Sequence, residues 1–398
     1  MLVLMAAATP ASPRCLGRHW LGAWAASPSD AGNGGFVDQS LRLIVTPTFG
    51  GRRVRVRLSN RFGRQPVTFA ASWIARRESG ATLVSHSARR LRFAGRRAVT
   101  IPAGEEVVSD SVLLRFRPFQ DLAVSVYVQG ASGPATEHEL ALQTSYASPR
   151  GSGDHSGEQR GSAFTVESTK RAYITDVEVR APSGVGAAVA LGDSITDGTG
   201  PYDVNDRYTD FLAKRLSGAR GRPRLSVLNA GLGGTGLLND ALFFGPSALH
   251  RLNADVIDQA GASVVIVLDG TNDTGGGPSS ADEVIAALRT IVDRLHEAGL
   301  SVLLGTQTPA EGTISAHGTP AAIAARNRIN DWIRTGGGAD GVVDFHAAVR
   351  DPSDFDRLRP EYDSGDHLHP NAAGYDAMAL AVDLGLLRAP ACSRSGRD

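Results

Sequence analysis

Apolar and polar residues alternate along the first half of the chain. Arg53–Leu58 and Leu122–Val128 alternate strictly, as a strand with one buried and one solvated face requires. Similar runs separated by turn residues lie at 65–76, 96–102, 107–116, 139–148 and 173–181. Many short strands with glycine-rich connections are typical of a sandwich or jelly roll. We therefore predict an all-β domain of sandwich or jelly-roll type over residues 18–182.

After Pro182 the apolar runs become continuous and helical stretches separate them, which is the pattern of a buried parallel sheet. The predicted strands cover 187–191, 225–228, 263–268, 301–305 and 342–345. The predicted helices lie near 206–217, 281–298, 320–334 and 371–386. Because strand and helix alternate, we expect an α/β domain over residues 183–390, with a doubly wound parallel sheet and helices on both faces.

The two ends of the chain differ from both domains. Met1–Ala11 has the apolar core and small-residue end of a secretory signal, although a basic leader is missing. We therefore treat residues 1–17 as signal-like or disordered, residues 391–398 as a tail, and the protein as secreted. No other stretch is long and apolar enough to span a bilayer, so we expect no integral membrane association.

Charge and cysteine content narrow the function classes. Lys and Arg number 41 and Asp and Glu also 41, so no net field favours nucleic acid as a partner. The two cysteines, Cys15 and Cys392, stand at opposite ends of the chain. They could form one disulfide or remain two unpaired thiols, and the sequence leaves both readings open.

Polar motifs follow three of the predicted parallel strands. Gly192–Ser194 follows the first strand, Asn229–Gly234 the second and Asp269–Asp273 the third. In open α/β sheets ligands bind beyond the carboxyl ends of the strands. We therefore expect these three loops to converge on one edge of the sheet.

Ser194 is a candidate nucleophile, and a serine needs a base. The loop Asp366–Pro370 supplies one, because Asp366 could hold one ring nitrogen of His369 while the other faces Ser194. Two alternatives remain: His367 and His369 could be surface or capping residues, or could bind a metal with Asp366. No His-x-x-x-His or Cys-x-x-Cys spacing occurs, so we expect no metal.

An oxyanion formed at Ser194 would need hydrogen-bond donors. Asn272 offers two amide N–H groups, and the backbone N–H groups of Gly234 and Ser194 could add two more. Asp193 can only accept hydrogen bonds when ionised, and we interpret it as a structural residue of the nucleophile loop.

One motif favours a different function. Gly231–Gly236 matches the G-x-G-x-x-G dinucleotide pattern after a strand, and Asp258 lies at about the right distance beyond it. However, residues 237–257 contain no clear second strand, which that pattern requires. A nucleotide-binding enzyme remains the first alternative.

Taken together, the blocks at 192–194, 229–234, 270–273 and 366–369 resemble the four ordered blocks of the SGNH hydrolases, also called GDSL esterases and lipases. The resemblance implies Ser194 as nucleophile, Asp366 and His369 as its partners, and Ser194, Gly234 and Asn272 as the oxyanion hole. Thr235 departs from the asparagine or serine that is common after the oxyanion glycine. Thr196 excludes the G-x-S-x-G motif of α/β-hydrolases.

The N-terminal half, with Trp20–Pro28 and Arg57–Gly63, also looks like the β domain of some secreted actinobacterial members. We therefore predict a serine carboxylic ester hydrolase that forms an acyl-enzyme without a cofactor. Its expected substrates are short acyl esters, such as O-acetylated carbohydrate or small lipid and aryl esters. The second alternative is a glycan-binding protein with an inactive hydrolase domain.

Overall fold

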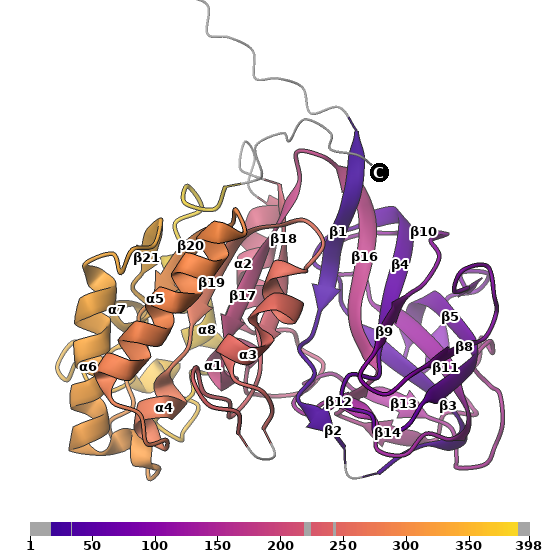
Figure 1. The fold of residues 1–398 in the computed structure, drawn as a ribbon, viewed down its shortest axis with the longest axis horizontal. Coiled ribbons are helices and arrows are strands. Elements are labelled where there is room, and N and C mark those ends of the chain that lie inside the picture. The colour runs from indigo at the N-terminus through magenta and orange to yellow at the C-terminus, as the bar shows by residue number, and fades with distance from the viewer. Residues whose placement is uncertain (1–16, 33, 219–223, 242–243, 389–398) are drawn as a thin grey trace, which may run out of the picture.

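The computed structural model describes residues 17–32, 34–218, 224–241 and 244–388, and Figure 1 shows a strand-rich half beside an α/β half. Cys15, Cys392 and the signal-like segment lie outside the described residues, so the disulfide and secretion remain predictions. The boundaries given above for the two domains also remain predictions.

The described residues of the N-terminal half form sixteen strands, and their bounds are as follows: β1 (Arg18–Ala25), β2 (Asp30–Ala31), β3 (Val37–Val45), β4 (Gly51–Ser59), β5 (Val67–Ser79), β6 (Thr82–Leu83), β7 (Arg89–Arg90), β8 (Val99–Ile101), β9 (Glu106–Val108), β10 (Val112–Phe116), β11 (Leu122–Ala131), β12 (Thr136–His138), β13 (Ser145–Ala147), β14 (Val166–Ser168), β15 (Arg171–Ala172) and β16 (Ile174–Pro182).

These strands form three sheets, and all of their pairings are antiparallel among the described residues. One sheet has the order β1-β16-β4-β10, with β9 also on β4. A larger one has the order β14-β13-β3-β11-β5-β6, with β7 and β8 also on β5, and a small one has β15-β12-β2. Alternate side chains of β3, β4 and β11 point into one shared apolar cluster. The N-terminal half from β1 to β16, called the β region below, is therefore rich in strands as predicted. Its jelly-roll topology stays a prediction.

The strand predicted over 139–148 is largely wrong, because only β13 forms there. The preceding residues contact the other half of the chain instead of pairing with a strand. The Ala141 carbonyl accepts a hydrogen bond from Arg207 at 2.8 Å. Leu140 lies so close to Gly233 that a Cβ added there would be 2.5 Å from its Cδ1. The predicted run 107–116 is also divided, into β9 and β10.

In the C-terminal half the strands are β17 (Gly186–Gly192), β18 (Leu225–Gly231), β19 (Ala262–Leu268), β20 (Ser301–Gly305) and β21 (Gly341–Val343). The helices are α1 (Ser194–Asp197), α2 (Tyr208–Gly218), α3 (Ala248–Leu252), η1 (Asn253–Ile257), α4 (Thr271–Gly275), α5 (Ala281–Glu297), η2 (Ala316–Gly318), α6 (Pro320–Arg334), α7 (Phe345–Val349), η3 (Pro360–Tyr362) and α8 (Ala372–Ala381). The four longest helices match the predicted ones, whereas the short helices α1, α3, α4 and α7 had no periodic signal.

The C-terminal strands form one parallel sheet in the order β18-β17-β19-β20-β21. Alternate residues face opposite sides, because successive side chains of a strand point in opposite directions. Val189 and Leu191 of β17 pack in one cluster with α3, α5 and α6. Ala188 and Ala190 pack in another with α2, α7 and α8. Helices therefore cover both faces of the sheet, as predicted.

The β region covers the part of one sheet face that these helices leave free. Strand β1 lies beside β18 in Figure 1, and Leu21 belongs to the same apolar cluster as Leu228. The backbone N–H of Gly22 donates to the carbonyl of Ala260 at 2.7 Å. The apolar core is thus continuous between the two halves of the molecule.

Candidate functional site

Three neighbouring parallel strands end at the same level. Gly192 at the end of β17 is in register with Gly231 of β18 and with Leu268 of β19. Ser194, Gly234 and Asn272 follow two, three and four residues after those positions. The structure therefore brings the three predicted loops to one edge of the sheet.

Ser194 is the first residue of α1, immediately beyond β17. Asp193 caps this helix, because its buried carboxylate accepts the backbone N–H of Ile195 at 2.9 Å. Burial raises the pKa of Asp193 to about 6. As the first helical residue, Ser194 keeps a backbone N–H with no partner in the helix. Glycine is required at 231, since a Cβ there would lie 2.1 Å from the nitrogen of Asp197 in α1.

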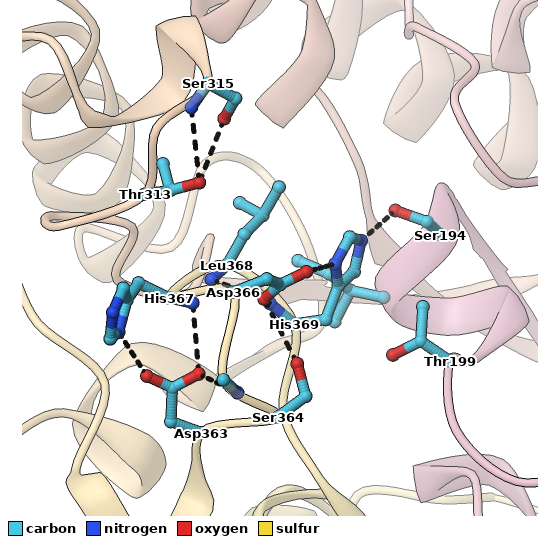
Figure 2. Close-up of polar contacts among 12 residues, drawn as sticks. Ser194, Thr199, Thr313, Ser315, Asp363, Ser364, Asp366, His367, Leu368 and His369 are labelled. Atoms are coloured by element: carbon cyan, nitrogen blue, oxygen red, sulfur yellow. Dashed lines mark hydrogen bonds and ion pairs between the residues drawn. The ribbon is translucent and has the colours of Figure 1, made fainter.

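His369 connects Ser194 to Asp366 (Figure 2). Its Nε2 lies 2.9 Å from Ser194 Oγ, and its Nδ1 lies 2.6 Å from Asp366 Oδ2. A carboxylate can only accept, so Nδ1–H donates to Asp366 and Nε2 is left to accept the hydroxyl proton of Ser194. This is the arrangement that turns a serine into a nucleophile.

Asp366 is held in its ionised form. Burial raises its pKa, but hydrogen bonds from the His369 ring and from the backbone N–H groups of His369 and Leu368 outweigh burial and lower it to about 2. The hydroxyl of Ser364 adds a further donor at 3.1 Å. The negative charge can therefore stabilise an imidazolium while a proton rests on His369.

His367 belongs to a separate pair. Its Nδ1 and backbone N–H both meet the carboxylate of Asp363, and its φ of 60° turns the residue away from Ser194, as Figure 2 shows. The three side chains of the metal alternative are thus divided between two pairs, His367 with Asp363 and His369 with Asp366. In the described part of the chain, no group of three or more His, Cys, Asp or Glu side chains could hold a metal ion.

The second loop places Gly234 beside Asn272. The amide nitrogen of Asn272 donates to the carbonyl of Thr235 at 2.8 Å, which leaves one of its N–H groups for another acceptor. Gly234 has a φ of +75°, and its N–H has no partner among the described residues. A Cβ at Gly234 would lie 2.3 Å from the ring of Phe244. The loop thus combines available donors with an apolar wall.

His317 is a site residue that the sequence analysis missed. Its Nε2 donates to the Oδ1 of Asn272 at 3.0 Å, and its Nδ1 lies 2.9 Å from the hydroxyl of Ser315. This contact fixes which end of the amide is oxygen and points the nitrogen toward the Gly234 loop. Burial first, and then the charge of His369, lower the pKa of His317. A lone histidine in a Gly- and Ser-rich loop gave no signal of this role.

His138 of β12 is a second missed residue. Its Nε2 lies 3.1 Å from Asp197 Oδ1, and both side chains are buried. The other oxygen of Asp197 accepts the backbone N–H of Gly233, the neighbour of Gly234, at 2.9 Å. His138 Nδ1 meets the carbonyl of Ser27 at 2.6 Å. The β region therefore contacts both the nucleophile helix and the oxyanion loop.

The nucleotide-binding interpretation of Gly231–Gly236 is not supported. The next described helix after these glycines, α3, begins only at Ala248, so no helix N-terminus meets the loop. Carboxylates lie beside it instead, since Asp197 accepts the N–H of Gly233 and Asp273 accepts the N–H groups of Leu237 and Leu238, which directly follow the loop. Negative charge beside the loop opposes phosphate binding.

The helices in the described part of the chain include none with the length and apolar character to cross a membrane.

Residues 190–377 match the family model described as the GDSL-like Lipase/Acylhydrolase family. A search of curated proteins finds no match to the chain.

Solved structures resemble about half of the chain. A carbohydrate acetylesterase from Sinorhizobium meliloti is 16% identical, with 49% of this chain and 96% of that chain covered and a TM-score of 0.40. An acetylxylan esterase from Geobacillus stearothermophilus is 22% identical, with 49% and 91% covered and a TM-score of 0.37. A lipolytic protein of the G-D-S-L family from Desulfitobacterium hafniense is 17% identical, with 49% and 96% covered and a TM-score of 0.39.

Proposed function

We propose that Ser194 is the nucleophile of this carboxylic ester hydrolase. The proposal starts from the match of residues 190–377 to the GDSL-like lipase/acylhydrolase family. The observation that carries the proposal is the hydrogen-bonded chain from Ser194 through His369 to Asp366. A serine with such a base supports a working hydrolase over a glycan-binding protein with an inactive one.

The proposed reaction has two acyl-transfer steps. Ser194 Oγ bonds to the ester carbonyl carbon while its proton moves to His369 Nε2. The oxyanion accepts hydrogen bonds from the N–H groups of Ser194 and Gly234 and from the amide of Asn272. The ester C–O bond then breaks, and the leaving alcohol takes the proton from His369. Water, deprotonated by the same nitrogen, releases the acid and restores the serine hydroxyl.

Two apolar side chains support a preference for short acyl groups. Phe244 packs against Gly234, and Leu140 of the β region packs against Gly233. Both are partly exposed, at 52% and 41% of their surface, so a substrate can reach them. They narrow the space beside the oxyanion loop. We propose acetyl esters of carbohydrates or of small aryl alcohols as substrates.

The test of the nucleophile is Ser194→Ala. We expect this variant to lose hydrolysis of 4-nitrophenyl acetate and labelling by a fluorophosphonate, while its circular dichroism and melting temperature stay unchanged. Ser152→Ala, a serine of the β region, is the matched control and should keep both. Full activity in Ser194→Ala would refute the proposed function.

The test of acyl length is Phe244→Ala. We expect the ratio of kcat/KM for 4-nitrophenyl octanoate to kcat/KM for the acetate to rise by about 10-fold. The smaller side chain would leave room for about two to three further methylenes of the acyl chain in an apolar pocket. A variant with the wild-type ratio would show that Phe244 does not limit the acyl chain.

We also propose, on the resemblance of its N-terminal half, that the protein is of the secreted actinobacterial type with a β domain. N-terminal sequencing of the protein exported by a bacterial host tests this: cleavage within the first 20 residues is expected, and retention in the cytoplasm would refute it.

A further inference from the structure

A groove of about 790 Å³ lies at the seam between the two halves of the molecule, and four arginines line it: Arg52, Arg115, Arg117 and Arg224. We call it the arginine groove. One wall comes from β4 and β10 of the β region, and the other from α2 and the start of β18.

The arginine groove is separate from the site around Ser194. Strand β18 begins at Leu225 in the groove and ends at Gly231 beside α1. Six residue steps of a strand span about 20 Å.

No described acidic residue neutralises the positive charge of the groove. Its lining residues, as far as the structure describes them, include no Asp or Glu. Within the described residues, the guanidinium groups of Arg52, Arg115 and Arg117 form no ion pair and no hydrogen bond, and all three residues are exposed. Arg55 and Arg57, further along β4, show the contrast, because both pair with Glu178. The chain is neutral as a whole, so the groove is a local excess of charge.

The shape and the apolar residues of the groove indicate the occupant. Phe116 is 4% exposed and the Phe49 ring lies under Arg224, so neither offers the open aromatic face that nucleic-acid bases need. The groove is concave with walls from both halves of the molecule, which suits a polymer chain better than a flat membrane. Arginine side chains bind carboxylates through two parallel N–H groups. We propose that the arginine groove binds an acidic polysaccharide that carries carboxylates along its length.

The consequence for catalysis rests on the proposed function. A polymer held in the arginine groove keeps its neighbouring units near the catalytic edge, which raises their effective concentration there. The groove then lowers KM for an O-acetylated acidic polymer. It leaves the hydrolysis of a small aryl acetate unchanged, because that substrate does not reach the groove.

The test measures binding of de-esterified polygalacturonate to the full chain by calorimetry at low ionic strength. We expect binding that weakens as salt is added, and a loss of about tenfold in affinity in Arg115→Gln/Arg117→Gln. The control is Arg64→Gln/Arg97→Gln, which removes the same charge from exposed positions outside the groove and should bind as wild type.

Three outcomes overturn the proposal: no binding of polygalacturonate, an equal loss in both double variants, or tighter binding of phosphatidylglycerol vesicles or of a single-stranded oligonucleotide. The kinetic readout is KM for acetylated polygalacturonate, which should rise in the groove variant while kcat for 4-nitrophenyl acetate stays constant. Binding should survive in Ser194→Ala, so a failure of the proposed nucleophile and a failure of the groove give different results.

Discussion

At the scale of single residues, Asp366 determines how the His369 ring is protonated. Its Oδ1 accepts backbone N–H groups while its Oδ2 accepts Nδ1–H. In Asp366→Asn the amide nitrogen would face Nδ1 and favour the tautomer with the proton on Nε2, which cannot accept from Ser194. We expect kcat for 4-nitrophenyl acetate to fall by about 100-fold or more with little change in KM.

The control for this prediction is Asp363→Asn, which alters the neighbouring Asp363–His367 pair. Because that pair is turned away from Ser194, kcat should stay within about threefold of wild type. Equal losses of kcat in the two variants would mean that Asp366 supports the conformation of the loop and not the tautomer of His369.

At the scale of elements, β12 reaches the catalytic loops through His138. Its ring nitrogens face only acceptors, namely the carbonyls of Ser27 and Leu140 and the carboxylate of Asp197. These contacts hold the ring in place, and Asp197 extends them to Gly233, whose backbone N–H it accepts. His138 is thus a positioning residue for the oxyanion loop.

We expect His138→Ala to lower kcat about 10- to 100-fold with KM nearly unchanged, because a small displacement of the oxyanion donors is costly only in the transition state. His138→Gln, which keeps one donor, should recover part of the rate. His155→Gln, at a more exposed histidine of the same half paired with Glu158, should be neutral. A rise in KM alone would contradict a positioning role.

Helix α7 contains a buried histidine that should make stability depend on pH. Burial first, and then the charges of Arg326 and Arg334, lower the pKa of His346 to about 4. Between pH 6.5 and 4 the unfolded chain binds a proton at this residue and the folded chain does not, so stability falls as pH falls through that window.

In His346→Gln this contribution is absent. The free energy of unfolding, measured by urea titration, should therefore decline less between pH 7 and pH 4.5 than in wild type, by about 2 kcal/mol. Parallel pH curves for the two proteins would show that His346 is protonated equally in both states.

At the scale of the whole molecule, the buried Arg251 of α3 connects the two halves. It donates to the carbonyls of Gly192 and Ala230 at the ends of β17 and β18, and to the hydroxyl of Ser27. Its partner Asp255 also binds Arg61 of the β region at 2.9 Å. This network closes over the same strand ends from which Ser194 and the oxyanion loop project.

We expect Arg251→Met to lower the free energy of unfolding by about 3–5 kcal/mol, since it removes a buried donor to two carbonyls and one of the two cations beside the buried Asp255. Wild type should unfold in one transition, because the apolar core is continuous between the halves. Arg328→Met, which breaks an exposed pair with Asp282, should cost under about 1 kcal/mol. Similar losses in both variants would contradict the connecting role of Arg251.

Local sequence patterns are sufficient to predict the elements whose side-chain pattern repeats. The alternating strands β4 and β11, the continuous strands β17 and β19 and the long helices α5 and α6 follow from local periodicity. The loops after the parallel strands could be placed at one edge because such strands end together. Ser194, Asp366 and His369 were therefore predictable as neighbours, and the structure joins them by hydrogen bonds.

The residues from distant segments that support these three depend on how the chain packs. His138 and His317 are single histidines with no motif, and their roles follow from buried contacts to Asp197 and Asn272. The stretch 139–144 is not a strand, because its partners lie in the other half of the chain. Likewise the balanced net charge gives no indication that four arginines line one groove in the folded chain. Periodicity encodes local structure, whereas contacts between segments that are distant in the sequence depend on how the sheets pack.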